Sequence, residues 1–343
     1  MKELQKTVQH NCHISDAQFA GNYTLCIYLL KMREFYRWEQ QLPFGRKISN
    51  DDFGPWLTQR EALWDDVEEQ DYSLLNADGA SCSAFDTVSI NEQFNRQGLV
   101  YSGGYGSYGK PIFFLAELDS KTVYEDYTLY IAGHELARDV TAPPGMAQDK
   151  AVFIRRESLR RFIWEKLEES HWHHQENPLA RALGCYNFKD QLHESLDKMT
   201  DMEVDTVLYH EIGEIRASQV LGSDWEQMLI QMPRSQSEFM ARAIKDHLAD
   251  ALSTLPRLLE NREPAQLHFY FANLSGMRKV LFPSLYDAYN QWINGNSLQP
   301  IKQLISQSEQ HWASLAKGML ELFEKHQQKG YPEMEALVKN SYL

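Results

Sequence analysis

The sequence predicts an α-rich α+β protein, in which a bundle-like helical body carries a small antiparallel β-sheet inserted around residues 98–155. Hydrophobic residues recur with a helical period over most of the chain. Between Leu99 and Ile154 the pattern changes to runs of β-branched and aromatic residues, such as PIFFLAEL and TVYEDYTLYIAG. We therefore expect three segments: helical residues 1–97, a β-rich region at 98–155 and a helical domain at 156–343, with the two helical segments free to pack as one body.

The helical period, together with helix start and stop signals, places the individual helices. They are expected over residues 15–41, 55–75, 157–169, 201–221, 235–255, 267–292 and 301–326, with a loop at 76–83. Asp16 stands near the start of the first helix and Pro43 follows its end. The loops at 222–234 and 293–300 are short enough to leave the later helices packed together.

The overall charge and the cysteine content restrict the class of protein. The net charge is −14, from 34 basic and 48 acidic residues, which disfavours a general attraction to nucleic acid or anionic membrane. No stretch approaches the roughly 20 apolar residues of a membrane-spanning helix, and the first residues lack an apolar signal core. The four cysteines form no CxxC pair, which suits reduced thiols. We expect a cytoplasmic protein without nucleic-acid or membrane partners.

Two glutamates and a histidine interrupt the apolar face of the helix expected at 201–221. At about 100° per residue, Glu211 falls inside the apolar stripe and Glu214 lies at its margin, with His210 one turn before Glu214. The stripe consists of Val204, Val207, Leu208, Ile212 and Ile215. Burying an unpaired carboxylate costs roughly several kcal/mol, so such a glutamate needs a cation, hydrogen-bond donors or its own proton.

The helix expected at 235–255 carries a second set of polar residues toward the core. His247 lies inside its apolar stripe, and Asp250 follows one turn later near the margin. The stripe consists of Met240, Ala243, Ile244, Leu248, Ala251 and Leu255. Metal sites in helical bundles are built in this way, with Glu and His projecting inward from facing helices.

Our leading hypothesis is therefore a metal-dependent enzyme, expected to be of the redox class, with its site between these two helices. The expected ligands of iron, manganese or zinc are His210, Glu211, Glu214 and His247, with Asp250 orienting His247. Tyr209 and Glu34 are further catalytic candidates. The order His-Glu-x-x-Glu matches neither the Glu-x-x-His pairs of di-iron bundles nor the His-Glu-x-x-His of zinc proteases. The pattern thus identifies no reaction, and it leaves room for a small-molecule substrate.

Two alternatives come from other classes of protein. In the first, the same residues pair with groups such as Arg216 and Arg242, and they form a buried polar network in a non-catalytic protein-binding or scaffold protein. In the second, the segment GYGSYGK forms a hairpin that covers a bound small molecule with Tyr105, Tyr108 and Lys110. A phosphate-binding glycine loop needs a helix after it, whereas the strand-like PIFFL follows here.

For three other groups of histidines, the sequence allows either a functional site or a structural role. His10 and His13 have metal-ligand spacing beside Asp16, but an N-terminal tether or cap is favoured. The pair His134-Glu135 is either a site at a sheet edge or, as favoured, a solvated turn. The histidines at 171–174 follow an acidic helix, where a role at the helix end is favoured.

The N-terminal block HNCHISDAQFAGNYTLCIYLLKMREFYRWEQQLPFG resembles the opening of a family of uncharacterised bacterial proteins. The likeness covers residues 10–45 and extends to the YHEIGE segment at 209–214. The resemblance implies a bacterial cytoplasmic protein. It supplies no activity, cofactor or site residue, so the hypotheses above stand on the residues alone.

Overall fold

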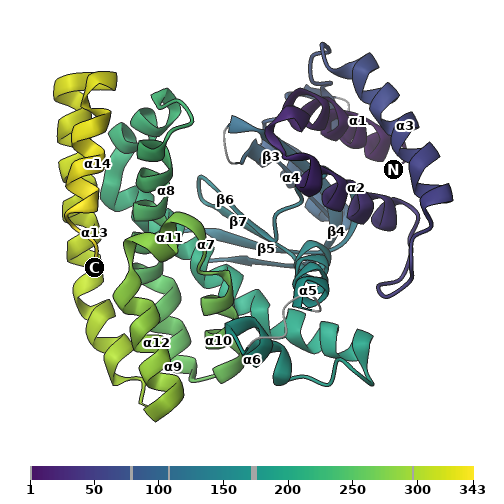
Figure 1. Ribbon diagram of the computed structural model, residues 1–343. Helices are drawn as coiled ribbons and strands as arrows, with labels where there is room; N and C mark the ends of the chain where they lie inside the picture. The colour runs from purple at the N-terminus through teal and green to yellow at the C-terminus, as the bar shows by residue number, and fades with distance from the viewer. Residues whose placement is uncertain (1, 78–79, 107–108, 171–175, 296) are drawn as a thin grey trace. The chain divides into compact units, whose positions relative to one another are not determined.

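The computed structural model describes residues 2–77, 80–106, 109–170, 176–295 and 297–343, and the chain divides into two compact units (Figure 1). The first unit spans Met1–Trp164 and the second spans Glu165–Leu343. The expected segments 1–97 and 98–155 both lie within the first unit. The α+β class, with helix predominating, is confirmed.

A five-stranded sheet forms where the sequence predicts one, but it is mixed rather than purely antiparallel. Its strands, in spatial order, are β3 (Leu99–Tyr105), β4 (Pro111–Val123), β5 (Thr128–Arg138), β7 (Ala151–Arg155) and β6 (Gly145–Gln148). Strands β5 and β7 run parallel, because the second strand of the β6–β7 hairpin, and not the first, lies beside β5. A separate two-stranded sheet, β1 (Leu75–Ala77) with β2 (Ala80–Cys82), occupies the stretch expected to be a loop.

Alternate residues of the central strands enter two different hydrophobic clusters. Leu99, Tyr101, Phe113 and Leu115 join one cluster with residues of α1 (Lys2–Phe19) and α4 (Thr87–Phe94). Their neighbours Val100, Ile112 and Phe114 join a second cluster, which includes Phe153 of β7. Burial on both faces explains the nearly unbroken apolar runs of these strands.

The first expected helix is in fact two helices, so the prediction of one helix over 15–41 is wrong. Helix α1 already starts at Lys2, a 3₁₀ turn (Ala20–Asn22) ends it, and α2 (Leu25–Glu39) begins after Thr24. Helix α3 (Asn50–Val67) follows, with Ser49 as its N-cap. Helix α1 packs across β4 and β5 (Figure 1), and this tertiary contact outweighs the local start signal at Asp16.

A buried lysine joins α1 to the sheet. The Lys110 ammonium donates to Asp16 at 2.6 Å, to Asp139 at 3.1 Å and to Thr141 at 2.8 Å. Asp16 also accepts from the Val140 backbone N–H. Burial opposes the charge on Lys110, but the two carboxylates outweigh it and raise the pKa of the ammonium. The ammonium of Lys110 is therefore held in a buried contact between α1 and the sheet.

The second unit consists of helices around one hydrophobic core. They are α6 (Pro178–Gly184), α7 (Leu192–Gln231), α8 (Gln236–Ala249), α9 (Leu255–Asn261), α10 (Pro264–Asn273), α11 (Gly276–Leu281), α12 (Pro283–Gly295), α13 (Gln299–His326) and α14 (Tyr331–Lys339). Helix α5 (Arg156–Ser170) leads into this unit. Helix α8 contacts α7, α11, α13 and α14, and the apolar stripe predicted for it is buried as expected. The helix expected over 267–292 is instead divided into α10, α11 and α12.

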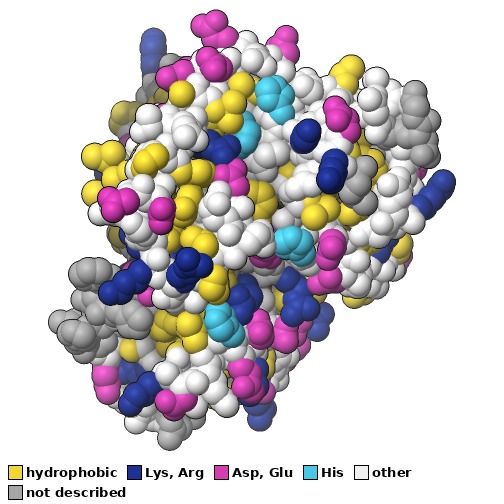
Figure 2. Space-filling view, turned by 90° about the vertical axis from the view of Figure 1, so that its right-hand side faces the viewer, with side chains coloured by type: hydrophobic (Ala, Val, Ile, Leu, Met, Phe, Trp, Pro, Cys, Tyr) yellow, Lys and Arg dark blue, Asp and Glu magenta, His cyan; other side chains and the backbone are white. Residues whose placement is uncertain are grey.

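On the face shown in Figure 2, acidic, basic and hydrophobic side chains are intermixed rather than gathered by sign. In the part of the chain that the structure describes, no helix is long and apolar enough to cross a membrane.

A π-helical turn, Asp250–Thr254, connects α8 to α9. Pro256 lies in the first turn of α9 and has no N–H to donate to the carbonyl of Leu252, four residues earlier. The Arg216 guanidinium of α7 donates to that carbonyl at 3.1 Å instead. The proline therefore accounts for the irregular turn, and the turn directs Asp250 toward α7.

Helices α7 and α8 approach most closely at Gly213. A Cβ atom at this position would lie 2.4 Å from the carbonyl oxygen of Ala249, a backbone atom that cannot move aside. Only glycine allows this approach, which places the two predicted polar clusters side by side.

We expect Gly213→Ala to lower the free energy of unfolding by about 1–3 kcal/mol, because the added methyl group pushes the helices apart. Thermal and urea unfolding would measure the change. Gly184→Ala is the matched control: its Cβ meets no atom within 4 Å, so neutral or slightly raised stability is expected. Equal stability of the Gly213→Ala protein and the wild type would contradict this account.

Candidate functional site

The residues predicted to bind a metal lie on contacting helices, and most of them have protein partners. His210, on α7, lies 3.3 Å from a carboxylate oxygen of Asp250, in the π turn. Glu214 pairs with Lys245 of α8 at 3.1 Å. Glu211 is buried. Among the described residues, no group of three or more His, Cys, Asp or Glu is arranged to hold a metal ion.

Asp250 is the centre of this cluster, although the sequence places it only at the margin of the stripe. Its second oxygen accepts from Tyr270 at 2.8 Å and forms a close ion pair with Arg278. Burial disfavours the carboxylate, but Arg278 and His210 outweigh burial and hold the pKa of Asp250 below its ordinary value. Burial also disfavours the imidazolium of His210, yet Asp250, Glu214 and Glu211 raise the pKa of His210 to about 10. The pair is thus ionic at neutral pH.

His247 takes part in packing and is not oriented by Asp250 as expected. Its Nε2 lies 2.8 Å from the carbonyl oxygen of Arg278, and its ring stacks on Trp312 at 4.7 Å. Burial and the nearby Arg278 lower the pKa of His247 to about 4. The ring is therefore neutral at physiological pH.

The remaining predicted residues are spread over both units. Tyr209 of α7 accepts from the amide of Asn261 at 3.4 Å, while Glu34 lies in the first unit and pairs with Arg37. Tyr105 is exposed and stacks on Phe85. Tyr108 and the histidines at 171–174 lie outside the described residues.

The histidines before Asp16 belong to the contact between α1 and α3. His13 is buried against the Arg60 guanidinium and the Trp64 indole of α3. His10 lies 3.2 Å from the side-chain oxygen of Gln70. These contacts tether α1, which is the role favoured by the sequence.

A different site forms where β5 continues beyond its partner β7. The β5–β7 ladder ends at Ala132 and Arg155, so the edge of residues 133–138 needs other hydrogen-bond partners. Gln5 of α1 donates to the carbonyl of Leu136 at 2.7 Å, and Gln9 exchanges two hydrogen bonds with the backbone of Arg138. The pair His134-Glu135 therefore lies within a strand, and the solvated turn favoured by the sequence is wrong.

Glu135 is the buried acid of this strand edge, with an exposed fraction of 1%. One carboxylate oxygen accepts from Arg155 at 2.9 Å and from Ser158 at 2.5 Å. The other oxygen lies 3.7 Å from Arg138, too far for a hydrogen bond, and has no hydrogen-bond partner. Burial opposes ionisation, but Arg155 and Arg138 outweigh it and lower the pKa of Glu135.

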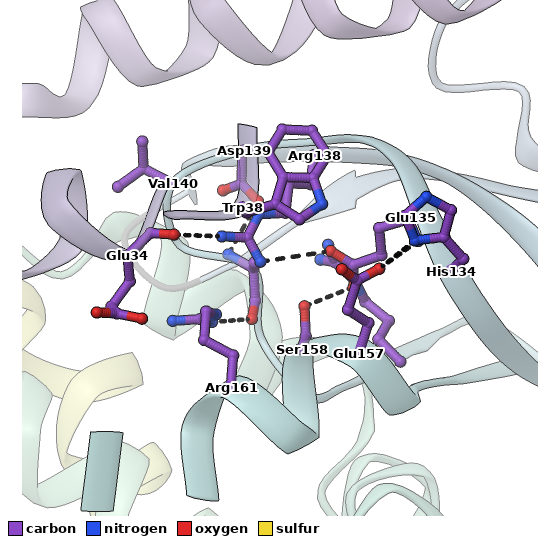
Figure 3. A network of polar contacts seen from close by, with 12 residues as sticks. Glu34, Trp38, His134, Glu135, Arg138, Asp139, Val140, Glu157, Ser158 and Arg161 are labelled. Atoms are coloured by element: carbon purple, nitrogen blue, oxygen red, sulfur yellow. Dashed lines mark hydrogen bonds and ion pairs between the residues drawn. The ribbon is translucent and has the colours of Figure 1, made fainter. Parts of the chain in front are cut away.

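Trp38 of α2 brings an unsatisfied donor to the same place. Its ring lies over the Arg138 guanidinium at 4.8 Å, and Figure 3 shows its N–H edge turned toward the side of Glu135 and His134. The indole N–H is buried and has no hydrogen-bond acceptor. His134 is 46% exposed, lies 3.0 Å from Glu157 and forms the outer part of the network.

These groups line one open pocket of about 430 Å³, which we call the β5-edge pocket. Its lining residues are Lys2, Gln5, Lys6, Gln9, Trp38, Glu39, Gln41, His134, Glu135 and Leu136. Glu135 and Trp38 both line the pocket, and each has one buried polar atom without a hydrogen-bond partner: a carboxylate oxygen and the indole N–H. Sequence reasoning considered Glu135 but missed Trp38 and the lysines, because nothing in the sequence brings α1 and α2 to the edge of β5.

Glu203 of α7 is a buried acid that the sequence analysis also missed. Its side chain is fully buried, and neither carboxylate oxygen has a hydrogen-bond partner. Burial, with a smaller contribution from Asp205, outweighs the opposing effect of Thr206 and raises the pKa of Glu203 to about 8. The spacing of the two glutamates could have predicted its burial, because Glu203 precedes Glu211 by two helical turns and lies on the same face of the helix.

Comparison with known proteins agrees with the division into two units. Residues 3–155 match the N-terminal domain, and residues 160–341 the C-terminal domain, of a family of unknown function named DUF6866. No curated protein and no solved structure matches the chain.

We expect Glu203 to make stability fall as the pH rises. The neutral carboxyl is favoured in the folded state up to about pH 8, whereas the unfolded carboxyl ionises near pH 4.3. Below the pKa that Glu203 has in the unfolded state, it does not lower the free energy of unfolding. Above that pH, the free energy of unfolding falls by up to about 1.4 kcal/mol per pH unit, until the pH passes the pKa of the folded state.

Glu203→Gln should remove this loss, so the variant should unfold at a higher urea concentration than the wild type at pH 8.5 and near the same concentration at pH 4. The exposed Glu226, changed to Gln, is the control; it lies in the last part of α7, beyond the non-helical Gly222. Parallel stability profiles of the wild type and Glu203→Gln would refute the assignment.

Proposed function

Since the chain belongs to the DUF6866 family of unknown function, its own geometry is the guide, and we propose that the first unit binds a small polar molecule in the β5-edge pocket. The observation that carries this proposal is the pair of unsatisfied groups, the Glu135 carboxylate oxygen and the Trp38 N–H. Each buried polar group without a partner costs about 1–3 kcal/mol, which a suitable ligand would recover.

The two groups define the chemistry that a ligand must present. Glu135 needs a hydrogen-bond donor, and Trp38 needs an acceptor. A hydroxyl or a carboxamide supplies both within one functional group. The volume of about 430 Å³ suits a metabolite-sized molecule.

The charge state of Glu135 favours binding over proton transfer. Arg155 and Arg138 lower the pKa of its carboxyl, so the carboxylate is a weak base at neutral pH. It therefore suits holding a donor in place. The surrounding hydrogen bonds from Arg155 and Ser158 also fix its position before any ligand enters.

Trp38→Phe tests the proposal, because it removes the indole N–H and keeps an aromatic ring over Arg138. A ligand at one hundred times its dissociation constant should stabilise the wild type by about 2.7 kcal/mol. The variant should bind up to about tenfold more weakly, as expected for one lost hydrogen bond. Differential scanning fluorimetry with a metabolite panel, followed by calorimetric titration, would measure both effects.

Trp225→Phe is the matched control for this experiment. Trp225 lies in the second unit, and its indole N–H is likewise buried without a partner. This variant should keep the ligand-induced shift of the wild type. Equal loss in the two variants, or no loss in Trp38→Phe, would exclude Trp38 as the binding group.

A metal-dependent enzyme in the second unit is a second candidate, favoured by the buried Asp250 carboxylate, which lies 3.3 Å from the His210 ring. A metal would have to displace Arg278 from Asp250 and Lys245 from Glu214. Elemental mass spectrometry on tag-free protein should then find stoichiometric iron, manganese or zinc that Glu211→Gln and His247→Ala abolish. Metal-free protein whose melting temperature does not change with added iron, manganese or zinc would exclude this candidate.

A further inference from the structure

We propose that the ligand of the β5-edge pocket is an organic anion, held by its charged group at Lys2 and Lys6 and by a hydroxyl or amide at Glu135 and Trp38. This inference rests on the proposed function and assigns the chemical class of its ligand. It combines two features of the pocket: the unsatisfied polar groups on its wall and an uncompensated positive charge at the start of α1.

The positive charge comes from two lysines one helical turn apart. Lys2 and Lys6 both line the pocket and are exposed. Neither forms an ion pair within the described ranges of the chain. At i and i+4 they lie on one face of α1, so both ammonium groups can reach the same anionic group.

The acids of the pocket do not compensate these lysines, because each has a different partner. Glu39 forms a close ion pair with Arg60 and accepts from the Trp56 indole at 2.5 Å. Glu135 pairs with Arg155. Lys2 and Lys6 therefore have no acidic partner among the residues that line the pocket, and Glu3, in the same turn but outside the lining, offsets only one of the two charges. An anionic ligand would balance the remaining positive charge.

The position of the lysines strengthens the attraction. Helix α1 begins at Lys2, so its first backbone N–H groups and the positive end of its dipole lie beside the two ammonium groups. Helix N-termini bind carboxylate and phosphate groups for this reason. Glu135, which is 1% exposed and has one oxygen without a hydrogen bond, independently indicates a ligand in the same pocket.

The two lysines and the buried groups of Glu135 and Trp38 together specify a ligand with two kinds of group: an anionic group and a hydroxyl or amide. A bare inorganic anion would meet the lysines but leave Glu135 and Trp38 unsatisfied. An uncharged polyol would satisfy the wall but not the lysines. Hydroxy acids and sugar phosphates carry both kinds of group in one molecule, and they are the class we assign.

Matched probes test this assignment by melting shift and calorimetric titration. Glycerate, gluconate, glycerol 3-phosphate and glucose 6-phosphate are the anions, glycerol, sorbitol and glucose their uncharged counterparts, and inorganic phosphate the bare anion. At least one organic anion should bind more tightly than its uncharged counterpart and than phosphate. Its affinity should fall as the salt concentration rises from 20 mM to 300 mM, because exposed charges are screened.

The double variant Lys2→Gln/Lys6→Gln should bind that anion roughly tenfold more weakly, since each exposed charge pair accounts for about fivefold or less. Lys47→Gln/Lys150→Gln removes the same charge from exposed lysines that do not line the pocket, and it should bind like the wild type. This control separates a local contact from the effect of net charge.

The outcomes distinguish this inference from the proposed function. Equal binding of charged and uncharged probes, or undiminished binding by the Lys2→Gln/Lys6→Gln protein, would overturn the anionic class while leaving a polar ligand at Trp38. If phosphate alone binds tightly, and its affinity is unchanged in Trp38→Phe, the ligand does not carry the second, polar group and the inference is overturned. If none of the probes binds, the anionic class fails, whereas the proposed function fails only if no uncharged polar molecule of the metabolite panel binds either.

Discussion

The need to pair every buried charge shapes both units of this protein. In the first unit, Lys110 is enclosed by Asp16 and Asp139, so α1 is tied to the sheet by an ion pair as well as by apolar contacts. In the second unit, Asp250 collects Arg278, His210 and Tyr270 from three different helices. Removing one partner of such a group leaves an unpaired charge in the protein interior. The cost in folding free energy is far larger than the stability that an exposed ion pair contributes. The arrangement of the helices is therefore held by specific contacts, and not by hydrophobic burial alone.

The same constraint identifies the site, because the pairing is incomplete there. Around Glu135 the arginines balance the charge, yet one oxygen and the neighbouring Trp38 N–H have no hydrogen-bond partner. In the cluster around Asp250, both oxygens of the central carboxylate have a partner, although one oxygen of Glu214 and the Nε of Arg278 have no hydrogen bond. Because Arg155 and Arg138 already balance the charge of Glu135, a ligand need not supply a positive charge there. It needs only to donate a hydrogen bond to the unsatisfied oxygen. We assign binding to the β5-edge pocket because Trp38 and Glu135 line an open pocket, and we treat the helix pair of the second unit as the second candidate.

The sequence predicted much of the fold because local patterns carry it. The β-rich region around 98–155 and the buried stripe of α8 follow from side-chain periodicity, and both are confirmed. The break between α1 and α2 and the parallel pairing of β5 with β7 were missed, because they depend on contacts between distant segments. His247 was placed correctly in the core, whereas Asp250 was placed only at its margin and is in fact buried. Their partner Arg278 belongs to α11, which no periodicity connects with α8.

By itself the sequence determined the α+β class, the position of the sheet and the presence of acids and histidines on helix faces that become buried. Only the tertiary structure decided what those residues contact. Because Gly213 has no side chain, α7 can pack closely against α8. Strand β7 is shorter than β5, so residues 133–138 of β5 extend beyond it, and glutamines of α1 form hydrogen bonds with that edge. The physical reason is that periodicity reports which face of an element is buried. A binding site depends on which elements meet, and the long-range packing of the chain decides that.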